Sequence, residues 1–219
     1  APGTTGAGTN RGAVYIMRLN ADGTVKSSTT IKDSASWGTS GDYSDRFGDD
    51  IYSLGDINGD GVADLVVMSE IAHGAEDSTT VINIVQLNSD GTVKHLTSLL
   101  SDTGGAPELA NIQLLSSTAV IGDIDGDGIN DLAVSGQEIP TANLANPFAS
   151  INVIYLLTLN SDGTIKSSTR LHGPDAGTNN LYSNFTALTA IDPANGNGTF
   201  QLGVGIPLYG AEFSNTGEP

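Results

Sequence analysis

The sequence GDINGDGVADLVV at residues 55–67 returns as GDIDGDGINDLAV at residues 122–134. A weaker third copy, IDPANGNGTFQLGV, occupies residues 191–204. The intervals between the copies are 67 and 69 residues when they are aligned on Asp56, Asp123 and Asp192. Because the first two copies join an acidic, glycine-rich loop to an apolar run, this stretch decides both the fold and the candidate site.

A second motif repeats with nearly the same period. NADGTVKSS, NSDGTVKHL and NSDGTIKSS begin at residues 20, 88 and 160, so their intervals are 68 and 72 residues. Two independent markers with one spacing indicate a structural repeat of about 70 residues.

The pattern of each repeat is that of β-structure. The runs GAVYIMRL, TVINIVQL and SINVIYLLTL, at residues 12–19, 80–87 and 150–159, are rich in β-branched and aromatic residues. Each leads into an Asp-Gly pair, which supplies the positive φ angles of a tight turn and predicts a hairpin. The apolar runs at residues 64–68 and 131–134 are typical of buried central strands. Without helical periodicity, we expect an all-β chain whose three repeats form antiparallel, four-stranded propeller blades.

The two full loops carry oxygen-bearing side chains at positions 1, 3, 5 and 9. Such side chains converge on one point in a tight loop, and oxygen-only ligands suit a hard cation, Ca²⁺ before Mg²⁺. The backbone carbonyl at position 7 adds a further ligand. The predicted ligands are Asp56, Asn58, Asp60, Val62 and Asp64 in the first loop, and Asp123, Asp125, Asp127, Ile129 and Asp131 in the second.

Three other structures could carry acidic loops of this kind. An EF-hand needs a bidentate Glu at position 12 and flanking helices, whereas position 12 is Val67 or Val134 and the sequence that follows is strand-like. A dockerin-like loop also runs into a helix and is excluded on the same ground. An Asx-rich turn that binds no metal stays open as the alternative.

The third copy has lost most of its charge. Asp192 persists, but Asn195, Asn197 and Gln201 replace the other carboxylates. One charge and three amides would hold Ca²⁺ poorly. We therefore expect two occupied calcium sites and a third that is empty or weak.

Composition excludes several classes of partner. The 219 residues include 8 Lys and Arg against 25 Asp and Glu, a formal net charge of −17, and no Cys. Nucleic acid and anionic membranes demand a basic face, so neither is expected as a partner. No run of apolar residues is long enough to insert into a membrane.

The pair Phe47-Gly48, with LGDINGDG at residues 54–61 and DLVV at residues 64–67, resembles the FG-GAP repeat of integrin α-subunit propellers. It is more similar still to bacterial extracellular versions, in which a GAVY strand precedes LNxDGTVK. The resemblance implies a β-propeller with Ca²⁺ in hairpin loops, secreted or on the cell surface, with a role in adhesion or assembly. The Phe-Gly pair is missing from the later repeats, and the ligand pattern carries over to the first two loops only.

The frame of the repeats suggests an array that begins and ends in half-units. Residues 1–219 divide into an N-terminal half-blade (12–33), two repeats (34–100 and 101–171) and a C-terminal half-blade (172–210). Three repeats cannot close a ring in one chain. An open half-blade exposes unpaired backbone groups, which a second copy could pair head-to-tail to give a filament or an oligomer. The competing expectation is that the sequence is a cut from a longer adhesin.

The expected function is that of an extracellular calcium-binding structural or adhesive subunit that assembles with itself. The alternative is a calcium-stabilised fragment of a larger adhesin that binds a ligand, carbohydrate or cell-surface protein. Trp37, Tyr43 and Phe47 could form a carbohydrate platform, although packing in the core is the competing use.

An enzyme is not expected. His73, His95 and His172 share no spacing, and the chain has no Gly-x-Ser-x-Gly elbow. The triplet at residues 102–104 matches an aspartic-protease motif in letters only, without a flanking hydrophobic strand. Glycosylation at the sequons of Asn184 and Asn197 stays open.

Overall fold

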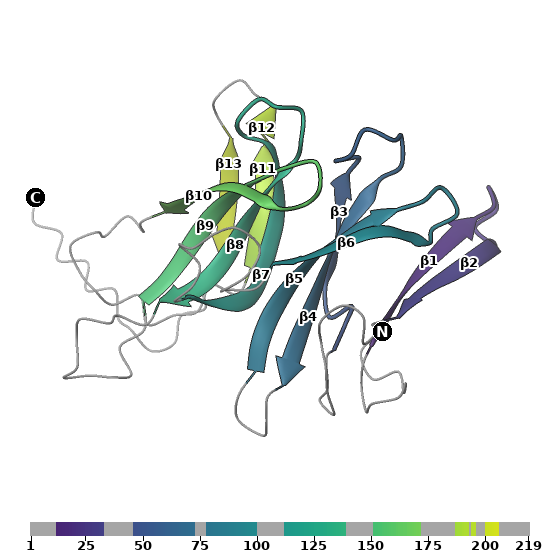
Figure 1. The fold of residues 1–219 in the computed structure, drawn as a ribbon, viewed down its shortest axis with the longest axis horizontal. Helices are drawn as coiled ribbons and strands as arrows, with labels where there is room; N and C mark the ends of the chain where they lie inside the picture. The colour runs from purple at the N-terminus through teal and green to yellow at the C-terminus, as the bar shows by residue number, and fades with distance from the viewer. Residues whose placement is uncertain are drawn as a thin grey trace, which may run out of the picture.

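A computed structural model describes residues 12–32, 46–72, 78–99, 112–138, 151–171, 187–192, 194–195 and 200–205. These residues form strands and turns without any helix, which confirms the all-β expectation (Figure 1). The strands are β1 (Ala13–Leu19), β2 (Val25–Lys32), β3 (Ile51–Gly55), β4 (Asp64–Ala72), β5 (Ser78–Leu87), β6 (Val93–Leu99), β7 (Ile112–Asp123), β8 (Asp131–Glu138), β9 (Ile151–Leu159), β10 (Ile165–Leu171), β11 (Ala187–Asp192), β12 (Ala194–Asn195) and β13 (Gln201–Gly205).

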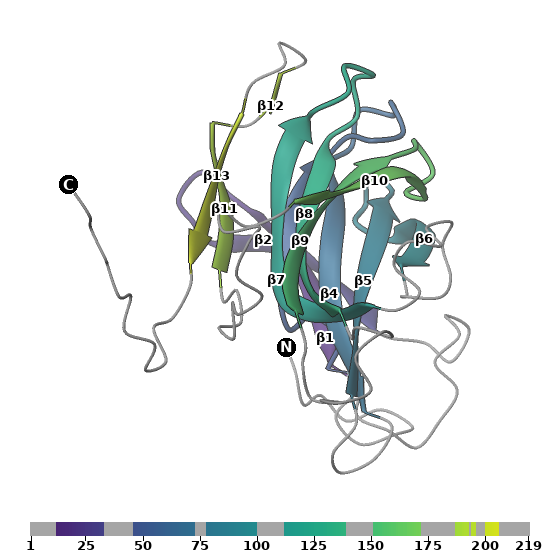
Figure 2. The same ribbon diagram turned by 90° about the vertical axis from the view of Figure 1, so that its left-hand side faces the viewer.

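The strands form four open sheets. β3-β4-β5-β6 is a four-stranded antiparallel sheet, and β10-β9-β8-β7 is a second antiparallel set that β12 extends in parallel to β7. The two-stranded sheet β1-β2 lies beside the β3–β6 sheet (Figure 1), and the two-stranded sheet β11-β13 lies beside β7 (Figure 2). The two acidic loops connect β3 to β4 and β7 to β8, which are the first two strands of each large sheet in chain order.

The three Asp-Gly hairpins have one geometry. In the first, Gly23 N donates to the carbonyl of Asn20 (3.0 Å) and Asn20 N to that of Thr24 (2.8 Å). Positive φ belongs to Gly23 alone, and Asp22 instead accepts hydrogen bonds from the backbone and hydroxyl of Thr24. The hairpins are confirmed, but each turn needs one residue with positive φ rather than two, as in a type I turn closed by a glycine bulge.

Three apolar clusters hold consecutive sheets together. Val14 and Phe47 belong to the cluster between the β1-β2 sheet and the β3–β6 sheet. Leu54 and Leu157 belong to the cluster between the two large sheets, and Leu188 to the one that joins β11-β13 to β7–β9. Each sheet thus packs against the next one along the chain.

The aromatic platform considered from the sequence is not formed by Phe47, which is 2% exposed and part of the core. Trp37 and Tyr43 lie outside the described residues. Among the described residues, no helix is long and apolar enough to cross a membrane.

Candidate metal centre

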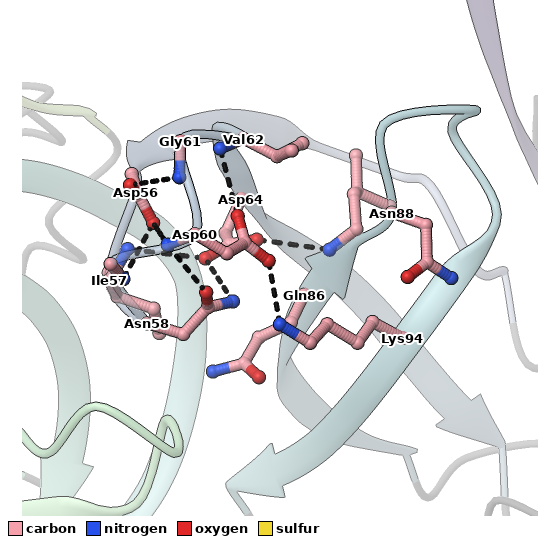
Figure 3. A network of polar contacts seen from close by, with 12 residues as sticks. Asp56, Ile57, Asn58, Asp60, Gly61, Val62, Asp64, Gln86, Asn88 and Lys94 are labelled. Carbon is pink, nitrogen blue, oxygen red and sulfur yellow. Dashed lines mark hydrogen bonds and ion pairs between the residues drawn. The ribbon is translucent and has the colours of Figure 1, made fainter.

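The first acidic loop is wound around the carboxylate of Asp56 (Figure 3). That carboxylate accepts hydrogen bonds from the backbone N–H groups of Gly59 (2.8 Å), Asp60 (3.1 Å) and Gly61 (2.7 Å). Gly59 and Gly61 have φ angles of 76° and 83°, a conformation that side-chain-bearing residues rarely adopt. These two glycines let three successive donors turn inward, so the loop curls as its sequence predicts.

The second acidic loop repeats this geometry. Asp123 accepts hydrogen bonds from the backbone N–H groups of Gly126 (2.7 Å), Asp127 (3.1 Å) and Gly128 (2.8 Å). At position 7, Ile129 N donates to Oδ1 of Asp127 (2.9 Å), as Val62 N does to Asp60 in the first loop (2.8 Å). The repeat predicted from sequence therefore extends to the individual hydrogen bonds of the loops.

Asp64, at position 9 of the first loop, is fully buried. Its Oδ2 accepts a hydrogen bond from Ile57 N (3.2 Å) and its Oδ1 one from Leu87 N (3.0 Å). The carboxylate thereby ties the start of the loop to the end of β5, 23 residues further on. Burial raises the pKa of Asp64, and the two backbone hydrogen bonds oppose that shift.

Asp131 makes the same connection in the second loop and is also fully buried. It accepts hydrogen bonds from Ile124 N (2.8 Å) and from Leu159 N (3.0 Å) at the end of β9. Burial raises the pKa of Asp131 to about 6. A bound cation would favour the ionised form of this carboxylate and would offset the free energy that burial of the charge costs.

Carboxylate oxygens of Asp123, Asp125 and Asp131 lie within 4.8 Å of one another, close enough to share one ion. In the described part of the chain, this is the one group of three acidic side chains at that spacing. The first loop has Asn58 at the third position, where the second has Asp125. The second loop therefore gathers more charge than the first, although the two backbones are alike.

Two lysines that lie outside the predicted ligand sets contact the acidic loops. Nζ of Lys94 lies 2.7 Å from Oδ2 of Asp60. Nζ of Lys166 lies 2.8 Å from Oδ2 of Asp125 and 2.7 Å from Oδ2 of Asp127. The hydrogen bond from Lys94 lowers the pKa of Asp60, and the bonds to Asp125 and Asp127 raise the pKa of Lys166. The ammonium groups reduce the repulsion among the carboxylates in each loop.

A signal for these lysines was present in the sequence. Lys94 and Lys166 occupy the same place in the repeated motifs NSDGTVK and NSDGTIK, on the strand that follows each turn. By itself the motif predicts only a hairpin, because nothing local indicates that its second strand brings a lysine to the acidic loop of the same sheet.

The strand register changes the alignment of the third loop. Asp192 pairs with Gln201 as Gly55 pairs with Asp64 and as Gly122 pairs with Asp131. Asp192 therefore aligns with Gly55 and Gly122, which come one residue before the first ligand of each full loop. The residue that aligns with the first ligand is Pro193. In this register the third loop has no carboxylate at any of the four ligand positions, which supports the expectation of a weak or empty site.

The remaining candidate residues do not join a site in the described chain. His95 is exposed on β6, opposite Gln86. Outside the described residues lie His73, His172, the triplet at residues 102–104, Asn184 and Asn197.

Comparison of the chain with family models finds no match. Comparison with curated proteins finds no match either. The interpretation of the acidic loops therefore depends on the geometry and chemistry of the chain's own residues.

Proposed function

We propose that this protein is an extracellular, calcium-binding structural or adhesive subunit, built from propeller blades of the FG-GAP type, that assembles with itself head-to-tail. The observation that carries the proposal is the convergence of Asp123, Asp125 and Asp131 in a loop whose backbone N–H groups point inward. The same loop stands at the same place in the neighbouring sheet. Two copies of one construction favour a repeated binding role over a chance cluster of acidic turns.

The chemistry of the ligands favours calcium. Both loops offer carboxylate oxygens and a backbone carbonyl oxygen, and the first loop adds the amide oxygen of Asn58. The chain has no Cys that would favour a softer metal. Calcium takes six to eight oxygen ligands in flexible geometry, whereas magnesium demands a near-ideal octahedron. A loop that supplies five protein oxygens and leaves room for water suits calcium better.

The position of each loop supports a structural role for the ion. Asp64 and Asp131 link the loop to the end of the third strand of the sheet, at Leu87 and Leu159. An ion held by such a carboxylate would stabilise the junction of three strands. Competing lysines in both loops are compatible with the modest affinities of extracellular calcium modules, which bind in the range of about 10⁻⁴–10⁻³ M.

The test is calcium-dependent stability. With calcium at about 100 times its dissociation constant, a single site adds about 2.7 kcal/mol to the free energy of unfolding. We expect calcium to raise the melting temperature, EDTA to reverse the rise, and magnesium to do less. Asp125→Asn should reduce the calcium effect, whereas Asp50→Asn, the same charge change at an exposed residue outside the loops, should not. Equal melting curves with calcium and EDTA, together with no heat of binding, would contradict the proposal.

A further inference from the structure

We propose that strand β1 of one copy pairs antiparallel with strand β13 of a second copy, so that the β1-β2 hairpin completes the sheet begun by β11 and β13. This inference rests on the self-assembly in the proposed function and adds the surface and the register through which it occurs. The expected neighbours are Met17 opposite Leu202, Ile16 opposite Gly203, and Tyr15 opposite Val204.

The first observation is the distribution of exposed apolar side chains. Seven large hydrophobic residues are exposed among the described residues, and six of them lie on the two-stranded end sheets. Those six are Tyr15, Met17, Leu19, Val25, Ile191 and Val204. Exposed apolar surface gathered on two small sheets indicates an interaction surface at each end of the array.

Residues at the equivalent positions of the two large sheets are buried. Met17 is 59% exposed, but Val85 and Leu157, at the same position of β5 and β9, are both 0% exposed. Leu19 is also 59% exposed, and its counterparts Leu87 and Leu159 are buried. The buried counterparts belong to clusters formed with a preceding sheet, whereas no preceding sheet covers β1 among the described residues.

The C-terminal sheet shows the same contrast. Val204 is 38% exposed, whereas its counterparts Val67 and Val134 are buried. Ile191, next to the strand end of β11, corresponds by register to Leu54 of β3, which is 0% exposed. In both end sheets, positions that are buried in the complete sheets therefore carry hydrophobic residues that are exposed to solvent.

The second observation is that, among the described residues, β1 pairs with no strand other than β2, and β13 pairs with no strand other than β11. In the complete sheets, β4 pairs with β5 and β8 pairs with β9. The corresponding strands are β13 and β1, and each is an edge strand of its two-stranded sheet. Within one copy, β1-β2 packs against the β3–β6 sheet and β11-β13 packs against β7–β9. Among the described residues β1 and β13 do not pair with each other, so we assign the pairing to two copies.

The register follows from the complete sheets. Leu65 lies opposite Val85 in the first, and Leu132 lies opposite Leu157 in the second. Gln201 pairs with the end of β11 as Asp64 pairs with the end of β3 and as Asp131 pairs with the end of β7. Leu202 follows Gln201 in sequence, so it corresponds to Leu65 and Leu132. Since Met17 corresponds to Val85 and Leu157, the same rule places Met17 opposite Leu202.

The third observation is a contact between successive sheets that stops at the end of the array. Thr29 Oγ1 donates to the carbonyl of Asp90 (2.9 Å), and Thr97 Oγ1 donates to that of Asp162 (2.7 Å). Each contact joins the last strand of one sheet to the Asp-Gly turn of the next. Thr169, at the same position of β10, is exposed, and the turn that would continue the series is the one containing Asp22 in a second copy.

The glycines of the three Asp-Gly turns show that the contacts between successive sheets also stop at the first hairpin. Gly91 and Gly163 are buried, and a Cβ on Gly163 would lie 2.7 Å from Cγ2 of Ile84. Gly23, in the same turn of β1-β2, is exposed and has no atom within 4 Å of such a Cβ. The first hairpin therefore presents, uncovered, the surface that the other two hairpins place against a preceding sheet.

The test uses disulfide formation between two single variants of the otherwise cysteine-free chain. Tyr15→Cys and Val204→Cys are mixed in equal amounts and oxidised mildly, and the products are separated without reductant. A pair in register brings the two sulfurs within bonding reach. We expect a covalent heterodimer of twice 22.4 kDa that is several-fold more abundant than any dimer of either variant alone.

A matched mixture of Tyr15→Cys and Gln201→Cys sets the background, because Gln201 is exposed but three residues out of register. An equal yield from both mixtures would overturn the proposed register.

Sedimentation of the unmodified chain separates this outcome from failure of self-assembly. Assembly without the specific cross-link contradicts the register alone. A monomer at every concentration contradicts both the register and self-assembly, while calcium binding is measured independently.

Discussion

Nζ of Lys166 lies 2.7 Å from Oδ2 of Asp127, a residue 39 positions earlier in the chain. The same ammonium group also contacts Asp125, one of the three carboxylates that converge in the second loop. A cation that binds there must compete with the lysine for these oxygens. The lysine thus stabilises the metal-free loop and should weaken the calcium binding that we propose for it.

Replacing Lys166 with Gln should tighten calcium binding. The ammonium group is exposed to solvent, where ion pairs are weak, so the dissociation constant should fall by a few-fold at most. Isothermal titration calorimetry measures this change. Lys26→Gln is the matched control, because Lys26 has the same place in the first hairpin but no acidic loop precedes that hairpin in its sheet. Weaker binding by Lys166→Gln would show that the lysine supports the site.

Asp131→Asn should destabilise the protein even in EDTA. The carboxylate accepts hydrogen bonds from Ile124 N and Leu159 N, and an amide places a donor against one of them. An unsatisfied buried donor costs about 1–3 kcal/mol, which urea denaturation would detect. Asp125→Asn, at an exposed position of the same loop, should leave stability in EDTA nearly unchanged. Equal losses from both variants would contradict a structural role for Asp131.

Calcium should stabilise the protein less in acid. The pKa of Asp131 is raised from 3.8 to about 6 because the carboxylate is buried. The metal-free folded state therefore binds a proton more tightly than the unfolded state, and its stability falls as the pH rises from about 4 to 6. Calcium needs the ionised carboxylate, so the stabilisation that it adds should grow over the same range. Melting temperatures with and without calcium at pH 5 and pH 7 test this, and equal increments would contradict it.

Gly163→Ala should destabilise the fold more than Gly23→Ala. Both glycines have similar positive φ angles, 81° and 83°, so each substitution carries a backbone cost of about 1–2 kcal/mol. Only at Gly163 would the new Cβ collide with Ile84, which adds an overpacking cost of about 1–3 kcal/mol. Chemical denaturation of the monomer compares the two. Equal costs would show that the contact between the two large sheets yields easily.

Met17→Asp should prevent self-assembly without unfolding the chain. Met17 is 59% exposed, and substitutions at exposed sites usually change stability by less than about 0.5 kcal/mol. In the assembled form, however, the new charge would be buried without a partner. Ile51→Asp is the control, since among the described residues Ile51 is the one large exposed hydrophobic residue outside the end sheets. Analytical ultracentrifugation should show smaller species for Met17→Asp only.

Much of the fold could be predicted from local patterns. The strand runs before each Asp-Gly pair are β1, β5 and β9, and the apolar runs after the acidic loops are the central strands β4 and β8. Alternation, β-branching and turn glycines act over a few residues, so one sequence suffices to detect them. The calcium ions, the extracellular location and the partners stay predictions, because they depend on molecules outside the chain.

The sequence by itself determined the repeat, the hairpins and the loops that wind around Asp56 and Asp123. The tertiary structure alone decided that Lys166 reaches Asp127 and that Asp131 is buried against Leu159 N. It also decided that Met17 is exposed although its counterparts are buried. The physical reason is that turns and strands depend on neighbours in sequence, whereas burial and charge pairing depend on which distant segments lie side by side.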